Sequence, residues 1–299
     1  MKGKKNVLQK IINFDDRINS ILPLNDGRLA LCKNDNLTIY DIKNNKEVQI
    51  MNGIQISYLY QFKDNKLYYY AFFGFTPKFN LIELTDNNKY IDRTDQLPKN
   101  IKAILIKEYC NKVMFSLLNE PSIDGYTKIQ GKYQLIWRFK TQYSNFITLK
   151  SGLMALSTKY VLRIYNIYTL KPNKNSFTNY KGIKTITFFS NNFLLMASKD
   201  QLAIFDYKNN KIVQSISTGY NIFKIIVNKF KVLIAETNEK SDKSRFTIYK
   251  IDIKNNFNIK KLLVNDNPHK TEAWNVFNMV QCNDGTIITH RDLCIKVWK

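Results

Sequence analysis

A nine-residue motif occurs twice in the 299-residue chain, and its spacing is the strongest constraint on the fold. Residues 41–49 read Asp-Ile-Lys-Asn-Asn-Lys-Glu-Val-Gln, and residues 206–214 read Asp-Tyr-Lys-Asn-Asn-Lys-Ile-Val-Gln. Residues 252–256 repeat the opening Asp-Ile-Lys-Asn-Asn. The two long copies begin 165 residues apart, which is about four times 41 and therefore fits the period of a four-stranded propeller blade. Helical repeats of similar length exist, so the pattern inside the repeat must decide.

The residues between the motif copies favour strands over helices. Short runs of β-branched and aromatic residues alternate with clusters of Asn, Asp, Gly and Lys. In the first repeat this pattern predicts four strands, at 17–24, 28–33, 36–42 and 47–51. Asp26-Gly27 separates the first two, and Asp-Gly between apolar runs is a strong hairpin signal because glycine tolerates positive φ.

The same four-strand unit can be followed along the whole chain. It predicts blades near residues 17–53, 54–94, 101–140, 143–180, 183–218, 221–264 and 274–298. The third blade has the weakest pattern, and there Pro121–Gly125 is predicted to be a turn before a third strand at Tyr126–Ile129.

The last unit holds only three strands, whereas residues 7–14 form a predicted strand without a unit of its own. A sheet that lacked one strand would expose a hydrogen-bonding edge, so residues 7–14 are expected to supply the fourth strand of the last blade. The predicted fold class is all-β: one seven-bladed β-propeller domain of four-stranded antiparallel blades over residues 1–299, closed by the N-terminal strand.

The last unit resembles a WD repeat. Asp292 stands before the strand Ile295–Trp298, where that family has an Asp in a tight turn before a strand that ends in Trp-Asp. The family also has a His about 30 residues before the Trp, and His269 is 29 residues before Trp298. The resemblance implies that His269, Thr289, Asp292 and Trp298 form the hydrogen-bond network that braces a blade. Weaker versions of the strand ending occur at Tyr40-Asp41, Tyr165-Asn166, Phe205-Asp206 and Tyr249-Lys250.

The resemblance implies a function in binding rather than catalysis, since WD-repeat proteins are mostly platforms that dock other proteins. The chain has two histidines and no glycine-rich phosphate loop, and a solvated turn explains the pair Asp15-Asp16 better than a glycosidase site does. We therefore expect no enzyme but a protein–protein interaction scaffold, a subunit of a larger complex. One or more proteins are its expected partners, with no small-molecule substrate and no cofactor.

The cysteines and the N-terminus add expectations about metals and compartment. Cys32, Cys110, Cys282 and Cys294 lie among apolar neighbours, so we expect buried, reduced thiols. A zinc site of Cys282, His290 and Cys294 matches no standard ligand spacing, and no metal is expected. The first residues are basic, but no apolar signal segment follows, and no apolar run approaches the about 20 residues of a membrane-spanning helix. Cytoplasm is the expected compartment, with nucleus and organelles left open.

The formal net charge of +22 comes from 46 Lys and Arg against 24 Asp and Glu. Loops that join first to second strands and third to fourth strands leave a propeller on one face. This predicted basic face carries Lys43, Lys46, Lys63, Lys66, Lys208, Lys211, Lys229 and Lys231. It suggests an alternative function, an anion-binding module that contacts RNA or an anionic membrane. Codon bias explains the lysines equally well, because the chain is also rich in Asn and Ile.

The opposite predicted face carries the loops between blades and those that join second to third strands. Five residues of types enriched in binding hot spots fall there: Arg17, Tyr143, Tyr220, Trp274 and Arg291. Packing at strand starts would equally explain Tyr220 and Trp274. Arg17 and Arg291 are expected to be neighbours where the last blade meets the first. This predicted docking face is the preferred surface for a protein partner.

Overall fold

The chain is all-β where its structure, a computed structural model, describes it. The described residues are 8–34, 36–53, 55–73, 76–85, 89–98, 103–109, 112–117, 122–140, 145–149, 152–158, 161–178, 182–228, 231–238, 243–266, 278–291 and 293–299. Within them, 28 strands form seven sheets of four strands each, and one 3₁₀ turn interrupts them. These sheets confirm the expected all-β class and the seven four-stranded repeats, whereas the closure of the sheets into one ring stays a prediction.

Contacts divide the chain into two compact units, residues 1–7 with 142–279 (unit 1) and residues 8–141 with 280–299 (unit 2). The first sheet of unit 2 contains β2 (Ile18–Pro23), β3 (Leu29–Lys33), β4 (Asn36–Asp41) and β5 (Lys46–Asn52). The second contains β6 (Gln55–Gln61), β7 (Leu67–Phe73), β8 (Thr76–Leu84) and β9 (Tyr90–Asp92), and the turn η1 (Thr94–Gln96) follows it. The third contains β10 (Ala103–Tyr109), β11 (Lys112–Leu117), β12 (Ser122–Ile129) and β13 (Lys132–Lys140).

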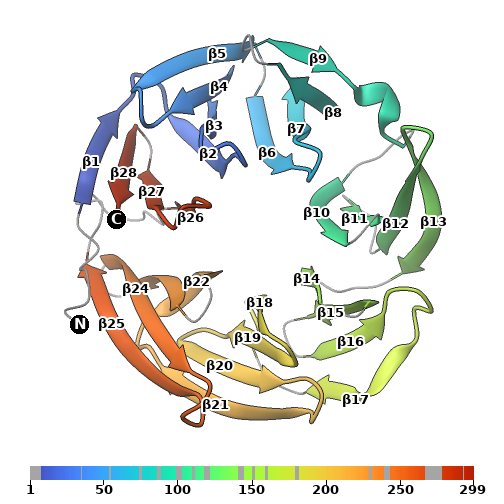
Figure 1. The fold of residues 1–299 in the computed structure, drawn as a ribbon, viewed down its shortest axis with the longest axis vertical. Coiled ribbons are helices and arrows are strands. Elements are labelled where there is room, and N and C mark those ends of the chain that lie inside the picture. Colours follow the sequence, from blue (N-terminus) through green and yellow to red (C-terminus); the bar gives the residue numbers. More distant parts are fainter. Residues whose placement is uncertain are drawn as a thin grey trace. The chain divides into compact units, whose positions relative to one another are not determined.

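The two ends of the chain share one sheet. Strand β1 (Leu8–Asn13) pairs antiparallel with β28 (Cys294–Trp298), with Leu8 opposite Trp298 and Asn13 opposite Cys294. The sheet continues through β27 (Ile287–Arg291) to β26 (Asn278–Gln281), in the order β1-β28-β27-β26 (Figure 1). The strand expected at residues 7–14 thus completes the last sheet, with residue 7 outside the described part.

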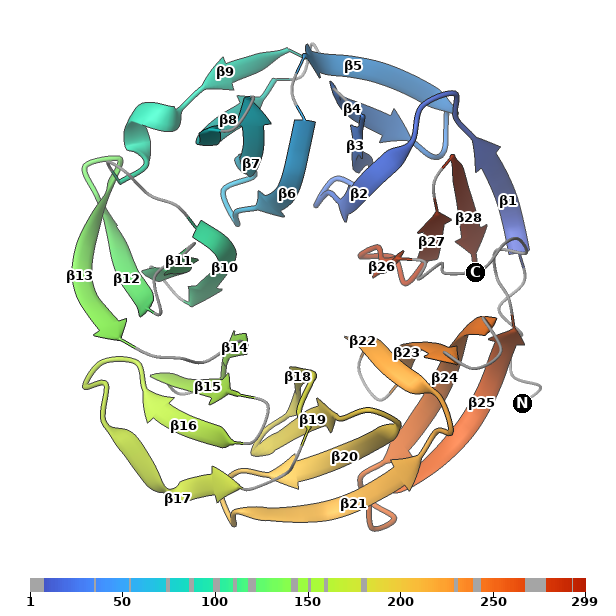
Figure 2. The same ribbon diagram turned by 180° about the vertical axis from the view of Figure 1, so that it is seen from behind.

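Unit 1 holds three further sheets. The first contains β14 (Asn145–Thr148), β15 (Leu153–Ser157), β16 (Leu162–Asn166) and β17 (Pro172–Thr178). The second contains β18 (Thr185–Ser190), β19 (Phe193–Ala197), β20 (Gln201–Asp206) and β21 (Lys211–Ser217). The third contains β22 (Asn221–Asn228), β23 (Lys231–Asn238), β24 (Lys243–Asp252) and β25 (Asn258–Asp266). Within this unit the first strands of the sheets are neighbours, with β18 between β14 and β22 (Figure 2).

Neighbouring sheets within each unit pack face to face around buried apolar clusters. In unit 2, Leu37 and Leu67 belong to one cluster that joins the first two sheets. In unit 1, Leu194 and Phe205 pack with the sheet before them, and Leu195 and Ile204 with the sheet after them. The second and third strands of a sheet are therefore buried on both faces, which explains their continuous apolar runs.

The repeated Asp-x-Lys-Asn-Asn motif is a turn with its own hydrogen bonds. Asp206 Oδ1 accepts the backbone N–H groups of Lys208 and Asn209, both at 3.0 Å, and Asp206 Oδ2 accepts Asn209 Nδ2 at 2.8 Å. Asp41 makes the same three contacts with the turn that follows β4. The last Asn of the turn has positive φ, 52° at Asn210, a conformation that Asn tolerates better than most residues. The motif thus recurs because each copy turns the chain from a third to a fourth strand.

Replacing Asp206 with alanine should lower the free energy of unfolding by about 1–2 kcal/mol, because the turn loses its buried side-chain acceptor. Asp206→Asn keeps one acceptor oxygen, so the free energy of unfolding should fall by less than in Asp206→Ala. Asp252→Ala is the matched control, since only one contact, at 3.3 Å to the N–H of Asn255, involves that side chain in the described part of the chain. Urea unfolding measures all three, and an equal loss at Asp206 and Asp252 would contradict this role for the motif.

The prediction of a turn at Pro121–Gly125 was wrong. Strand β12 already begins at Ser122 and runs through Gly125 to Ile129. The indole ring of Trp137 lies directly over Gly125, which it faces across the β12–β13 pair. This glycine therefore makes room for a ring inside a sheet, and it does not mark a bend.

Candidate functional site

The predicted docking face is described at three of its five residues. Tyr220 lies in the loop between β21 and β22, Arg17 precedes β2, and Arg291 ends β27, whereas Tyr143 and Trp274 lie outside the described residues. Strands β2 and β27 are in contact. Phe14 also donates its backbone N–H to the carbonyl of Leu293 at 2.8 Å. Arg17 and Arg291 thus belong to the same end of these two sheets of unit 2.

Tyr220 is part of a polar cluster in unit 1, with its ring against an arginine. The guanidinium carbon of Arg245 lies 3.6 Å from the centroid of the Tyr220 ring. The same guanidinium donates from Nη2 to the carbonyl of Thr218 at 2.7 Å and from Nε to Glu236 Oε2 at 3.0 Å. Cation–π contact is strongest when the cation is partly withdrawn from water, and the Arg245 side chain is only 11% exposed.

Glu236 is the fully buried anion of this cluster. It lies on β23 directly opposite Arg245 on β24. Thr247, two residues further along β24, donates its hydroxyl to Glu236 Oε2 at 2.6 Å. Burial and then the charge of Glu236 raise the pKa of Tyr249 to about 12. We call Thr218, Tyr220, Glu236, Arg245 and Thr247 the Tyr220 cluster.

The loop that carries Tyr220 is hydrogen-bonded to the turn between β19 and β20 of the preceding sheet. Thr218 donates its N–H to the carbonyl of Asp200 at 2.7 Å, and its hydroxyl lies 2.9 Å from the Tyr220 carbonyl. Ile222 donates its N–H to the carbonyl of Lys199 at 2.7 Å. Gly219 between them has φ of +75°, which only glycine adopts without strain. The backbone on both sides of Tyr220 is therefore held by hydrogen bonds.

The residues of the predicted basic face are divided between the two units. Lys43, Lys46 and Lys63 are exposed in unit 2, and Lys208, Lys211 and Lys231 are exposed in unit 1. Lys229 lies outside the described residues. Lys66 is different, because its Nζ forms an ion pair with Asp64 Oδ2 at 2.7 Å.

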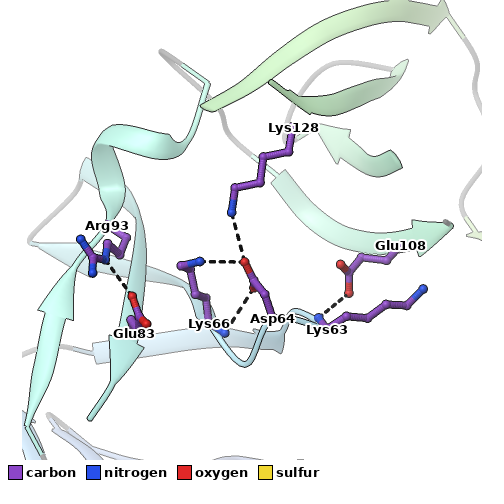
Figure 3. A network of polar contacts seen from close by, with 7 residues as sticks. All are labelled: Lys63, Asp64, Lys66, Glu83, Arg93, Glu108 and Lys128. Atoms are coloured by element: carbon purple, nitrogen blue, oxygen red, sulfur yellow. Dashed lines mark hydrogen bonds and ion pairs between the residues drawn. The ribbon is translucent and has the colours of Figure 1, made fainter. Parts of the chain in front are cut away.

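Figure 3 shows the contacts that carboxylates of unit 2 make with Lys63 and Lys66 of the predicted basic face and with Lys128. Asp64 also pairs with Lys128 at 3.1 Å, and Glu108 accepts the backbone N–H of Lys63 at 2.9 Å. Burial alone would raise the pKa of Asp64, but hydrogen bonds and the charges of Lys66 and Lys128 bring it below its usual value. Burial raises the pKa of Glu108. Part of the positive charge of this loop region is thus neutralised inside the fold.

Two of the four residues expected to form the WD-type network lie in the described part of the chain. Trp298 donates its indole N–H to Thr289 Oγ1 at 3.0 Å, and both side chains are buried. His269 and Asp292 lie outside the described residues, so the full network stays a prediction.

The described cysteines differ in the burial of their thiols. Cys32 and Cys282 are free and buried, Cys294 is free but only half-buried, and Cys110 is not described. The expectation of burial was therefore too strong for Cys294. Among the described residues, no group of three or more His, Cys, Asp or Glu side chains is placed to hold a metal ion. No helix in the described ranges is long and apolar enough to cross a membrane.

Solved structures share this fold at low sequence identity. A chain in the crystal structure of the Mitotic Checkpoint Complex matches with a TM-score of 0.74 at 11% identity, over 98% of this chain and 94% of that one. The WD40 β-propeller domain of Doa1 matches with a TM-score of 0.64 at 9% identity, over 99% and 97%. The computationally designed Ika8 protein matches with a TM-score of 0.61 at 11% identity, over 94% of this chain and 83% of that one. No protein-family model and no curated protein sequence matches the chain.

These matches define a WD40-like propeller fold, and identities this low show the fold alone. Sequence reasoning selected Tyr220 but missed Glu236 and Arg245. The sequence did contain a signal for this pair, because Glu236 directly follows the apolar run Val232–Ala235. A carboxylate in a buried strand needs a partner.

Proposed function

We propose that this chain is a divergent WD-repeat scaffold of the cytoplasm, a non-catalytic subunit of a larger complex that binds one or more proteins. Two separate patches are its candidate docking surfaces: Tyr220 with Arg245 in unit 1, and Arg17 with Arg291 in unit 2. The observation that carries the proposal is the fixed stack of Tyr220 on Arg245. Tyr and Arg are enriched among the residues that dominate binding energy, and a side chain ordered in advance loses little entropy when a partner binds.

Replacing Tyr220 with alanine should remove a hot spot and weaken partner capture by about 2 kcal/mol, roughly thirtyfold in Kd. The measurement is affinity purification from the native organism with quantitative mass spectrometry. Arg17→Ala with Arg291→Ala is a second variant, chosen because neither residue belongs to the Tyr220 cluster. Tyr168→Ala is the matched control, since Tyr168 is 57% exposed in the turn after β16.

The alternative function, binding of RNA or anionic membrane by the lysine-rich loops, makes a different prediction for the same experiment. Capture would then survive both variants but fall steeply with salt, with a slope in log K of about 0.7–0.9 for each neutralised phosphate. Unchanged capture by a folded Tyr220→Ala chain, together with that salt dependence, would reject the scaffold in favour of the alternative.

A further inference from the structure

Strand β13 is an outer strand of unit 2 with an open edge. It is the last strand in the order β10-β11-β12-β13, so its outer edge pairs with no strand of the described chain. It is nine residues long, which is long for an outer strand. Proteins usually protect such an edge, because its N–H and C=O groups can pair with another chain.

The face of β13 toward the neighbouring sheet is only partly covered. Tyr133, near its start, is buried and stacks on Phe62 with ring centroids 5.7 Å apart. Leu135 stands opposite Tyr126, which belongs to the same buried cluster, so Leu135 lies on that face as well. Nevertheless Leu135 is 50% exposed. The outer strand of the neighbouring sheet, β9, has only three residues, and the turn η1 that follows it contacts β13 (Figure 2).

A bulge adds a second exposed aliphatic residue to β13. The pairing shifts between Gly125 and Tyr126, which leaves Ile136 as the extra residue of β13. Ile136 is 41% exposed, and Ile129 at the other side of the hairpin is 44% exposed. Three large aliphatic side chains are thus open to solvent along one hairpin.

The turn and outer strand of this hairpin carry only positive charges. Residues 128–140 contain Lys128, Lys132, Arg138 and Lys140 and no acidic residue. Lys128 pairs with Asp64, and Arg138 makes a two-bond ion pair with the buried Asp124, both bonds at 2.8 Å. Lys132 and Lys140, at the two ends of the strand, are exposed, and the described residues offer neither of them an ion pair.

We propose that the open edge of β13 binds an extended acidic segment of a partner protein, which adds to the sheet as a fifth strand. Main-chain hydrogen bonds would supply affinity, and Leu135 and Ile136 would receive alternate apolar side chains. Lys132 and Lys140 would meet carboxylates at the two ends. A second copy of β13 is a poor occupant, because like charges opposite each other destabilise a strand pair. RNA fits less well, since bases stack on exposed aromatic rings, whereas the large apolar side chains that β13 exposes, Leu135 and Ile136, are aliphatic.

The test uses the purified full chain and a fluorescein-labelled peptide of alternating glutamate and valine, matched to the nine residues of β13. Fluorescence anisotropy should show saturable binding of this peptide but not of a lysine–valine peptide. Reversing both end charges, Lys132→Glu with Lys140→Glu, should weaken it by about tenfold or more, since each exposed pair contributes up to about 1 kcal/mol. Leu135→Ser with Ile136→Ser should weaken it as well.

The matched control is β25, which is also an outer strand of nine residues. It carries Lys260 and the exposed Leu262, so Lys260→Glu with Leu262→Ser should leave binding unchanged. Hydrogen exchange should slow in β13 amides on binding. A glutamate–proline–valine peptide, in which each proline removes one backbone N–H donor and fixes φ, should bind much more weakly.

Four results would overturn the proposal: no binding of the acidic peptide, equal binding of the proline peptide, protection outside β13, or displacement of the peptide by oligouridylate. Concentration-dependent dimerisation lost in Leu135→Ser would also overturn it, in favour of a second copy. The proposal goes beyond the Tyr220 cluster, and the two can fail separately. Peptide binding at β13 does not depend on whether Tyr220→Ala loses its partners.

Discussion

Replacing Glu236 with alanine is expected to lower the free energy of unfolding by about 3–5 kcal/mol. Glu236 is fully buried, and its partner Arg245 is 11% exposed. Alanine would leave the guanidinium inside the sheet without a counter-charge and the hydroxyl of Thr247 without its acceptor. A buried charge that loses its partner is among the most destabilising changes a point mutation makes. Urea unfolding of the variant beside the wild type measures the loss.

Two controls show whether burial is the cause. Glu83 and Arg93 form a pair of similar length, 2.8 Å, but their side chains are 40% and 36% exposed (Figure 3). Glu83→Ala should therefore cost no more than about 1 kcal/mol. Glu236→Leu combined with Arg245→Met should recover most of the loss, because an apolar pair of similar volume is tolerated where a single charge is not. Equal losses at Glu83 and Glu236 would show that the pair does not behave as a buried one.

Much of the fold can be predicted because its signals are local. Asp41 and Asp206 each accept the backbone N–H groups two and three residues later, so five consecutive residues specify the turn. The spacing of these turns then limits the strands between them to one four-stranded unit. The pairing of β1 with β28 followed from a different argument, the count of strands left over at each end.

The site was harder to predict from the sequence than the fold, because its contacts join residues that are distant in the sequence. Arg245 meets Glu236 only through the register of β23 with β24, and it meets Tyr220 only because the loop before β22 folds back over it. Asp64 likewise neutralises Lys128, which is 64 residues away. A count of lysines in loops contains no information on such pairs, so it could not indicate that Lys66 of the predicted basic face pairs with Asp64.

Gly125 was misread for a related reason. Its neighbours, Pro121 to Tyr126, have the composition of a turn, and glycine commonly supplies the positive φ that turns require. In the structure Gly125 lies within β12, and its missing side chain is what matters. The space above it is filled by Trp137 from the adjacent strand, a contact that only the register of β12 with β13 specifies.

Gly125→Ala is therefore expected to lower the free energy of unfolding by about 1–3 kcal/mol, the usual cost of overpacking. A Cβ at this position would lie 2.2 Å from Trp137 Cε2, so the whole indole must move, and Gly125→Val should cost more. Gly131→Ala, in the turn of the same hairpin, is an instructive contrast. Its positive φ of 80° makes alanine strained, yet no atom lies within 4 Å of a Cβ there.

A double-mutant cycle separates the two causes. Trp137→Leu alone loses packing, but in its presence Gly125→Ala should cost clearly less, because the ring that it displaces is gone. The cost of Gly131→Ala should be the same with Trp137 or with leucine, since backbone strain does not depend on the indole. Urea unfolding of the singles and doubles gives both coupling energies. If Gly125→Ala and Trp137→Leu were additive, the ring would not be what excludes a side chain from position 125, and the sheet geometry around it would need another explanation.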